Sequence, residues 1–331
     1  MSSRRAALAA ALAAAGLGLS ACGSTAPAAP TAGQTDDAGQ SGRIAVVASF
    51  YPLAYAIEQV GGDKVAVTNL TKPGAEPHDI ELTPQDVATV VDAKLAVYEK
   101  GFQPAVDKAI AEQEIAAFDV STVADLSLHY ADAINADHAH EEPGATDHTG
   151  HDHDNEAGTV DPHFWLDPIR YQKVAQAIGT ELGRLDPINK GIYYENATNF
   201  SKELTTLDGD FAAALRTCQS KKLVTSHAAF AYLADRFGLQ QVAISGLSPE
   251  AEPDPARLAA VADYVKTHKV TTIYTETLAS PALAETLAKE TGASTAVLDP
   301  LEGLTDSSPG TDYLSVMRAN LATLEKGQQC A

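Results

Sequence analysis

The chain has 331 residues, of which 45% are hydrophobic, so it is long enough to fill the cores of two ordinary domains. Its formal net charge is −21 at pH 7. An acidic surface of this kind repels nucleic acid and anionic lipid, so we expect neither as a partner. The charge permits binding of cations but does not establish it.

The first residues are typical of a secretory leader. A basic start with Arg4 and Arg5 precedes an apolar stretch of roughly 14 residues, shorter than the roughly 20 that span a membrane. The stretch ends in Leu19-Ser20-Ala21-Cys22, which resembles a bacterial lipobox. We therefore expect a signal peptide over residues 1–21 and lipidation of Cys22. The alternative is an ordinary cleaved signal with Cys22 merely nearby.

Residues 22–42 predict a flexible tether. After Cys22 they are almost entirely Gly, Ser, Thr, Ala, Pro, Gln and Asp. Such a segment buries too little apolar surface to offset the entropy of ordering it. The tether would hold the folded part, which we expect over 43–331, close to the outer face of the membrane.

From Arg43 onward, short apolar runs alternate with segments of helical periodicity. The runs predict buried strands at Ile44–Ser49, Val65–Leu70, Leu95–Glu99, Lys222–Thr225, Gln241–Ser245, Val270–Thr275 and Thr295–Leu298. Helices are predicted after the N-cap Thr83 and at His227–Phe237, Asp254–His268 and Pro281–Thr291. Strands and helices in alternation predict an α/β fold with parallel sheets that are covered on both faces.

Two segments interrupt this alternation. Residues 131–160 are acidic and histidine-rich and predict a mobile surface loop; its histidines are His138, His140, His148, His151 and His153. Residues 186–215 predict one long helix, with Asp186 as N-cap, Pro187 in its first turn and Gly209 as its weak point. The helix would join an N-terminal lobe at 43–185 to a C-terminal lobe at 216–331.

Two cysteines remain once Cys22 is assigned to lipidation. In an oxidising compartment, Cys218 and Cys330 are then expected to form a disulfide that anchors the C-terminus. The alternative is a pair of unrelated thiols.

Four short segments carry metal-ligand chemistry: Gly74–Asp79, Asp161–Pro168, Thr225–His227 and Asp299–Gly303. Three of them follow the carboxyl end of a predicted strand, where open α/β sheets bind ligands. Three neutral imidazoles and a carboxylate complete a tetrahedral zinc shell, and Asp79, Asp161 or Asp167 could orient a ligating ring. Each histidine also has a purely structural interpretation, as a turn, capping or packing residue. Trp165 is interpreted as a core residue.

These segments make the chain similar to a known family. It resembles the ZnuA/AdcA-type zinc-binding solute-binding proteins (cluster A-I) of bacterial ABC importers. The resemblance rests on Glu76–Asp79, Asp161–Pro168, Ser226–Phe230, Gly246–Glu250, Asp299–Leu304 and Tyr313–Leu321. It implies two α/β lobes, each a mainly parallel sheet, joined by one long rigid helix.

The resemblance also implies the ligands. His78, His163 and His227 would bind the metal, with Glu302 as the fourth ligand and Asp299, Glu276 or a water as the alternatives. The histidine-rich loop would collect zinc as an auxiliary element; otherwise it is a solvated acidic linker. Manganese-binding relatives have a carboxylate where His227 stands, and a third imidazole favours zinc.

The expected function is therefore zinc capture outside the cytoplasm and delivery to the membrane permease of an ABC importer. The protein would be a lipid-anchored monomer on the bacterial surface or in the periplasm. A secreted zinc hydrolase is the alternative from another class, but a His-Glu-x-x-His motif is absent from the sequence, and a fourth protein ligand would close the catalytic position. A manganese transporter protein, an adhesin and a metal buffer are the remaining alternatives.

Overall fold

The computed structural model describes residues 42–113, 115–130, 134 and 158–331. The predicted leader, Cys22 and the five histidines of the histidine-rich loop lie outside these ranges. Residues Gly42–Ala331 pack as one unit. Across the described part of the chain, every helix is too short or too polar to cross a membrane.

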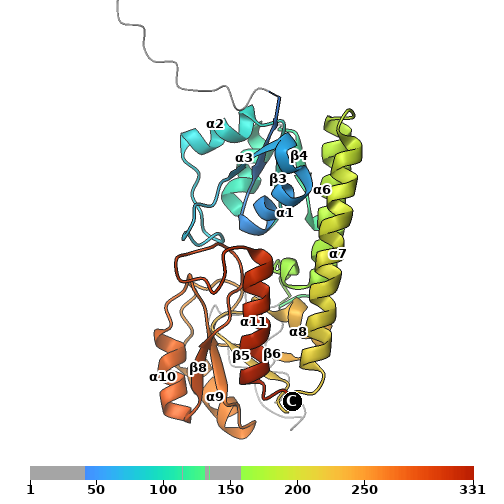
Figure 1. Cartoon of the computed structure of the whole chain (residues 1–331). Coiled ribbons are helices and arrows are strands. Elements are labelled where there is room, and N and C mark those ends of the chain that lie inside the picture. The colour runs from blue at the N-terminus through green and yellow to red at the C-terminus, as the bar shows by residue number, and fades with distance from the viewer. Residues whose placement is uncertain (1–41, 114, 131–133, 135–157) are drawn as a thin grey trace, which may run out of the picture. The chain divides into compact units, whose positions relative to one another are not determined.

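The N-terminal half is built on a parallel sheet with strand order β2-β1-β3-β4 (Figure 1). Its strands are β1 (Ile44–Ala48), β2 (Val65–Asn69), β3 (Leu95–Tyr98) and β4 (Ala117–Asp119). Its helical segments are α1 (Tyr51–Gly61), η1 (Gly62–Lys64), α2 (Pro84–Asp92), α3 (Pro104–Gln113) and α4 (Ser121–Ala124). The predicted N-cap at Thr83 is confirmed, because its hydroxyl accepts the Asp86 N–H and Asp86 accepts the Thr83 N–H.

The C-terminal half repeats this winding, with strand order β6-β5-β7-β8 and all strands parallel. Its strands are β5 (Lys222–Thr225), β6 (Gln240–Ala243), β7 (Thr272–Thr275) and β8 (Ser294–Val297). Its helices are α8 (Ala231–Phe237), α9 (Pro255–Thr267), α10 (Ala282–Thr291) and α11 (Tyr313–Gly327). In each half the first strand has the second strand on one side and the third on the other, so the strand order switches direction there. Such a switch point opens a ligand crevice at the carboxyl ends of the strands.

Helix α7 (Lys190–Leu215) runs alongside both halves (Figure 1). Its 26 residues correspond to about 39 Å at 1.5 Å per residue, and it passes through Gly209 without a break. The predicted start near Asp186 is wrong: Asp186 follows α6 (Pro168–Leu185), and its carboxylate accepts hydrogen bonds from the Asn189 amide and the Tyr193 hydroxyl. That turn reverses the chain, so α6 and α7 pack as a pair.

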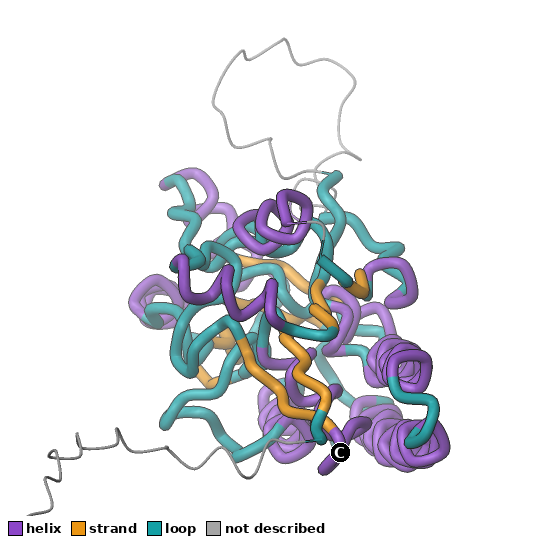
Figure 2. Tube along the Cα trace, turned by 90° about the horizontal axis from the view of Figure 1, so that it is seen from above, coloured by secondary structure: helices purple, strands orange, loops and turns teal. Residues whose placement is uncertain are grey.

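One large apolar cluster extends through both halves. It includes side chains from β1, α1 and α6, continues along α7, and reaches β5, α8 and α11. Figure 2, seen from a perpendicular direction, shows the helices arranged around the strands. The two sheets therefore share buried side chains, which favours a fixed arrangement of the loops between them.

The predicted disulfide between Cys218 and Cys330 is present. It closes a separation of 112 residues and joins the segment after α7 to the end of the chain. The Thr217 hydroxyl donates to the Ala331 carbonyl and the Ser220 N–H to the Gln328 carbonyl, so the C-terminal segment is also held by hydrogen bonds.

Candidate metal centre

Four side chains from separate loops converge between the two sheets. His78 follows β2, His163 immediately precedes the short helix η2 (Phe164–Leu166), His227 follows β5, and Glu302 follows β8. One ligand atom from each lies within 4.8 Å of the others. Glu302 Oε1 is 3.2 Å from His78 Nε2 and 3.1 Å from the Nε2 atoms of His163 and His227.

These spacings suit a four-coordinate zinc ion. Zinc binds imidazole nitrogen and carboxylate oxygen at about 2.0–2.2 Å, and two such ligands at the tetrahedral angle stand roughly 3.3 Å apart. The distances around Glu302 Oε1 are close to that value. Three imidazoles and one carboxylate also make a donor set that zinc accepts in proteins, so the residues fit the ion.

Two of the rings are oriented by carboxylates. Asp161 Oδ1 lies 2.9 Å from His163 Nδ1 and accepts the His163 backbone N–H at 2.8 Å. Glu276 places Oε2 2.6 Å from His227 Nδ1 and accepts the His227 N–H through Oε1 at 3.0 Å. A carboxylate on Nδ1 fixes the tautomer that presents Nε2 to a metal. The predicted orienting role of Asp161 is confirmed.

The other carboxylates from the sequence analysis have different contacts. Glu276, one alternative for the fourth ligand, lies instead behind His227. Asp299 accepts hydrogen bonds from the Leu301 N–H and the Thr277 hydroxyl, which shapes the turn that carries Glu302. Asp167 caps α6 through its carboxylate, so its predicted role in orienting a ligand ring is wrong.

His78 has a different environment. Its side chain is 10% exposed, whereas those of His163 and His227 are fully buried. The ring packs edge-on against Phe102, with centroids 4.6 Å apart. Its loop is held from behind by Gln103, whose Nε2 donates to the Pro77 carbonyl at 3.0 Å. Gln103 lies 26 residues from that carbonyl in the chain, so local sequence gives no signal for the contact.

The cluster is strongly coupled electrostatically. Burial alone would raise the pKa of Glu302, but the surrounding histidines hold it well below its usual range. Burial opposes protonation of His163 and His227, yet Asp161 raises the pKa of the first, and Glu276 with Glu302 raises that of the second. Without metal, these shifts favour an ionised Glu302 and protonated rings at His163 and His227. A divalent ion would have to displace those protons.

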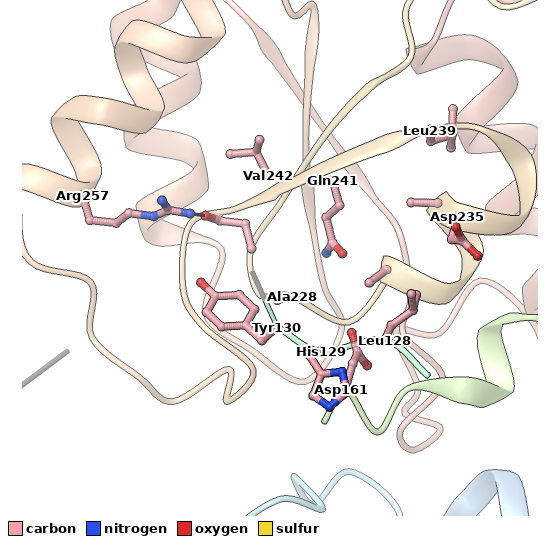
Figure 3. Close-up of a pocket in the computed structure, with 13 residues that line it drawn as sticks. Leu128, His129, Tyr130, Asp161, Ala228, Asp235, Leu239, Gln241, Val242 and Arg257 are labelled. Carbon is pink, nitrogen blue, oxygen red and sulfur yellow. Dashed lines mark hydrogen bonds between the residues drawn. The ribbon is translucent and has the colours of Figure 1, made fainter. Parts of the chain in front are cut away.

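A hollow of about 280 Å³ lies beside β6 and α8 (Figure 3). Its lining includes Asp161, Gln241 and Arg257. The four candidate ligands lie outside this lining. The hollow therefore adjoins the candidate metal centre through Asp161, which also contacts His163, but it contains none of the four ligands.

Comparison with known proteins agrees with this geometry. The chain is 40% identical over 288 residues to the zinc-binding lipoprotein AdcA of Streptococcus pneumoniae strain R6, covering 86% of this chain and 56% of AdcA. The chain thus spans about half the length of that relative. It is 36% identical over 313 residues to the high-affinity zinc uptake system protein ZnuA of Bacillus subtilis strain 168, covering 93% of this chain and 92% of ZnuA.

A solved structure shows the same fold. The Zn(II)-bound ZnuA-like domain of Streptococcus pneumoniae AdcA superposes with a TM-score of 0.69 and 36% identity, covering 87% of this chain and 99% of that domain. The model of the ZnuA family, described as zinc-uptake complex component A, periplasmic, matches residues 46–327. The chain therefore belongs to the ZnuA family of zinc-uptake binding proteins.

Proposed function

We propose that this protein captures zinc outside the cytoplasm and delivers it to an ABC importer. The observation that carries the proposal is the convergence of His78, His163, His227 and Glu302, whose ligand atoms lie within 4.8 Å of one another. The relatives' names support it, since one is a zinc-binding lipoprotein and another a zinc uptake protein.

The same ligand set distinguishes the proposal from its alternatives. The family supplies the binding component of an uptake system and is not a family of enzymes. Glu302 would occupy the fourth position, which a catalytic zinc site keeps open for water or substrate. Three imidazoles leave one oxygen ligand, whereas manganese prefers an oxygen-rich shell.

The surroundings of the site form the rest of the proposal. A lipid on Cys22 and a flexible tether over 22–42 would keep a monomer at the outer face of the membrane, beside the permease. Residues 43–185 and 216–331 would act as lobes joined through 186–215. The histidines within 131–160 would bind zinc weakly and raise its concentration near the high-affinity site.

Thermal unfolding tests the ligand set. A ligand that binds only the folded state stabilises it by mass action, so zinc should raise the melting temperature. His78→Ala should abolish most of this shift. His129→Ala, which removes an exposed histidine outside the cluster, should keep it. Equal shifts in all three proteins would contradict the ligand assignment.

Two further measurements separate the alternative functions. Competitive titration against manganese tests the metal, and manganese binding at least as tight as zinc binding would refute the zinc assignment. Growth of a deletion strain under zinc chelation tests transport. Unimpaired growth would favour an adhesin or a metal buffer.

A further inference from the structure

Trp165 lies between two loops that carry candidate ligands. It is the only tryptophan in the chain and is fully buried. Its indole Nε1 donates to the Pro300 carbonyl at 2.8 Å, and its own carbonyl accepts the Tyr313 hydroxyl at 2.6 Å. Both partners belong to the C-terminal half, whereas Trp165 leads into α6, which packs against α1 of the N-terminal half.

The position of Trp165 relates it to two ligands. It follows His163 by two residues, and its acceptor Pro300 precedes Glu302 by two residues. The indole ring packs against the His163 ring, with centroids 5.3 Å apart. It also contacts Phe102, the residue against which His78 packs, at 5.6 Å.

We propose that Trp165 is a positioning residue that fixes the spacing between His163 and Glu302 and thereby sets the zinc affinity of the site. The inference rests on the proposed zinc-binding function. The proposal is based on the hydrogen bond from the indole N–H to the Pro300 carbonyl, which joins the two ligand loops across the interface between the halves.

Burial makes the indole N–H sensitive to the position of its acceptor. A buried N–H without an acceptor is costly, so the indole favours the one loop arrangement in which the Pro300 carbonyl meets it. The turn after Pro300 is rigid: Leu301 has φ 59°, and its N–H is held by Asp299. A displacement of Pro300 is therefore passed on to Glu302. Residues that orient metal ligands typically change affinity by about 10–100-fold.

A purely structural role would make the indole only a filler of the core, and an isosteric replacement separates the two roles. Because the chain has one tryptophan, β-(3-benzothienyl)alanine can replace Trp165 alone in a tryptophan-auxotrophic host. Sulfur then stands where the N–H was, so the ring keeps its shape but loses the donor. We expect the zinc Kd to rise about tenfold. The visible absorption of bound Co²⁺, which reports four-coordinate geometry, should also change.

Tyr171→Phe is the matched control. Its buried hydroxyl donates to a different proline carbonyl, that of Pro52, at 2.6 Å, so the substitution also removes one buried donor from one prolyl acceptor. We expect a lower melting temperature with the zinc Kd and the Co²⁺ spectrum unchanged. Trp165→Phe provides a second variant, and it should weaken zinc binding at least as much as the isostere does.

Each outcome decides a point. An isostere with unchanged zinc Kd and Co²⁺ spectrum overturns the positioning role and leaves the zinc site intact. A Tyr171→Phe variant that loses as much zinc affinity as the isostere also overturns it, since the loss would then follow stability. An unmodified protein that binds no zinc overturns the proposed function, and this inference with it.

Discussion

Two of the three histidines in the cluster are each held at two points by a carboxylate of their own. Asp161 contacts both Nδ1 and the backbone N–H of His163, and Glu276 does the same for His227. Each ring is therefore fixed in position and in tautomer, with Nε2 directed at Glu302. His78 instead has Phe102 at its ring and Glu76 on its backbone N–H. The N-terminal half thus supplies the least constrained of the three imidazoles.

This electrostatic arrangement predicts how zinc binding depends on pH. The pKa values of His163 and His227 are raised, so their charged forms stabilise the metal-free fold below the unfolded pKa of 6.5, and this contribution is lost as pH rises through the folded values. Glu302 has a lowered pKa, so its charged form stabilises the metal-free fold above pH 4.5. This contribution is lost as pH falls through the lowered pKa. Zinc must displace the imidazole protons, so affinity should rise with pH, continuing above 6.5.

Calorimetry measures this proton exchange directly. Titration with zinc at neutral pH, in two buffers with different heats of ionisation, gives the number of protons released. We expect net release, and a zinc Kd that increases steadily as the solution is acidified. Zinc binding without proton release at neutral pH would show that the imidazoles are already neutral in the metal-free protein.

The sequence could predict the ligands more readily than the residues that orient them. His78, His163 and His227 each stand in a loop with recognisable ligand chemistry, and Glu302 follows a predicted strand. Glu276 could not be assigned to His227, because their contact depends on β7 lying beside β5. The order of strands in a sheet cannot be predicted from local periodicity. The same holds for Gln103 and Trp165, whose hydrogen bonds join residues distant in sequence.

At the scale of elements, short apolar runs between turn residues predicted seven of the described strands to within two residues. The eighth, β4, was missed: it has only three residues, its first position, Ala117, is exposed, and none of the three is fully buried. The helix starts predicted after Thr83 and at Asp254, where an N-cap precedes a proline, are confirmed, but the same pattern at Asp186 and Pro187 does not begin α7. The predicted helix start at His227 is wrong, because α8 begins at Ala231 and the intervening residues form the loop that presents the ring. Helix α6, the partner of α7, was missed.

The packing of α11 against β7 gives a prediction at this scale. Gly327 ends α11, and a Cβ there would collide with the Tyr274 hydroxyl and lie 2.9 Å from its Cζ. Overpacking of this kind costs about 1–3 kcal/mol, so Gly327→Ala should destabilise the fold in urea denaturation. Gly209→Ala is the matched control. Gly209 lies on the exposed face of α7, where its Cβ would meet nothing within 4 Å, so the change should stabilise the helix by about 1 kcal/mol.

The two substitutions are expected to change the free energy of unfolding in opposite directions, and this difference tests the packing. Both replace glycine by alanine in a helix, so helix propensity alone would make both stabilising. If Gly327→Ala stabilised the protein as Gly209→Ala does, α11 would not approach β7 as closely as the structure shows.

At the scale of the whole molecule, the candidate ligands come from both halves, and the apolar core also extends through both. Helix α7 and helix α11 connect the two sheets, and the Tyr313 hydroxyl at the start of α11 binds the carbonyl of Trp165 beside the site. The lower ends of the same two helices are joined by Cys218 and Cys330 (Figure 1). The start of α11 therefore lies beside the candidate metal centre, while the disulfide joins the segments that follow α7 and α11 and anchors the C-terminus.

Removing the disulfide should consequently lower stability without changing zinc affinity. α11 has 15 residues, so about 22 Å of helix separates the bridge from Tyr313. Loss of a native disulfide typically costs about 2–5 kcal/mol, mainly because the unfolded chain gains freedom. We expect the Cys218→Ala, Cys330→Ala double variant to unfold at lower urea concentration with an unchanged zinc Kd. The control is Tyr171→Phe, which leaves the bridge intact. A zinc affinity that fell with stability in the double variant alone would mean that the bridge, through α11, holds the ligand loops in place.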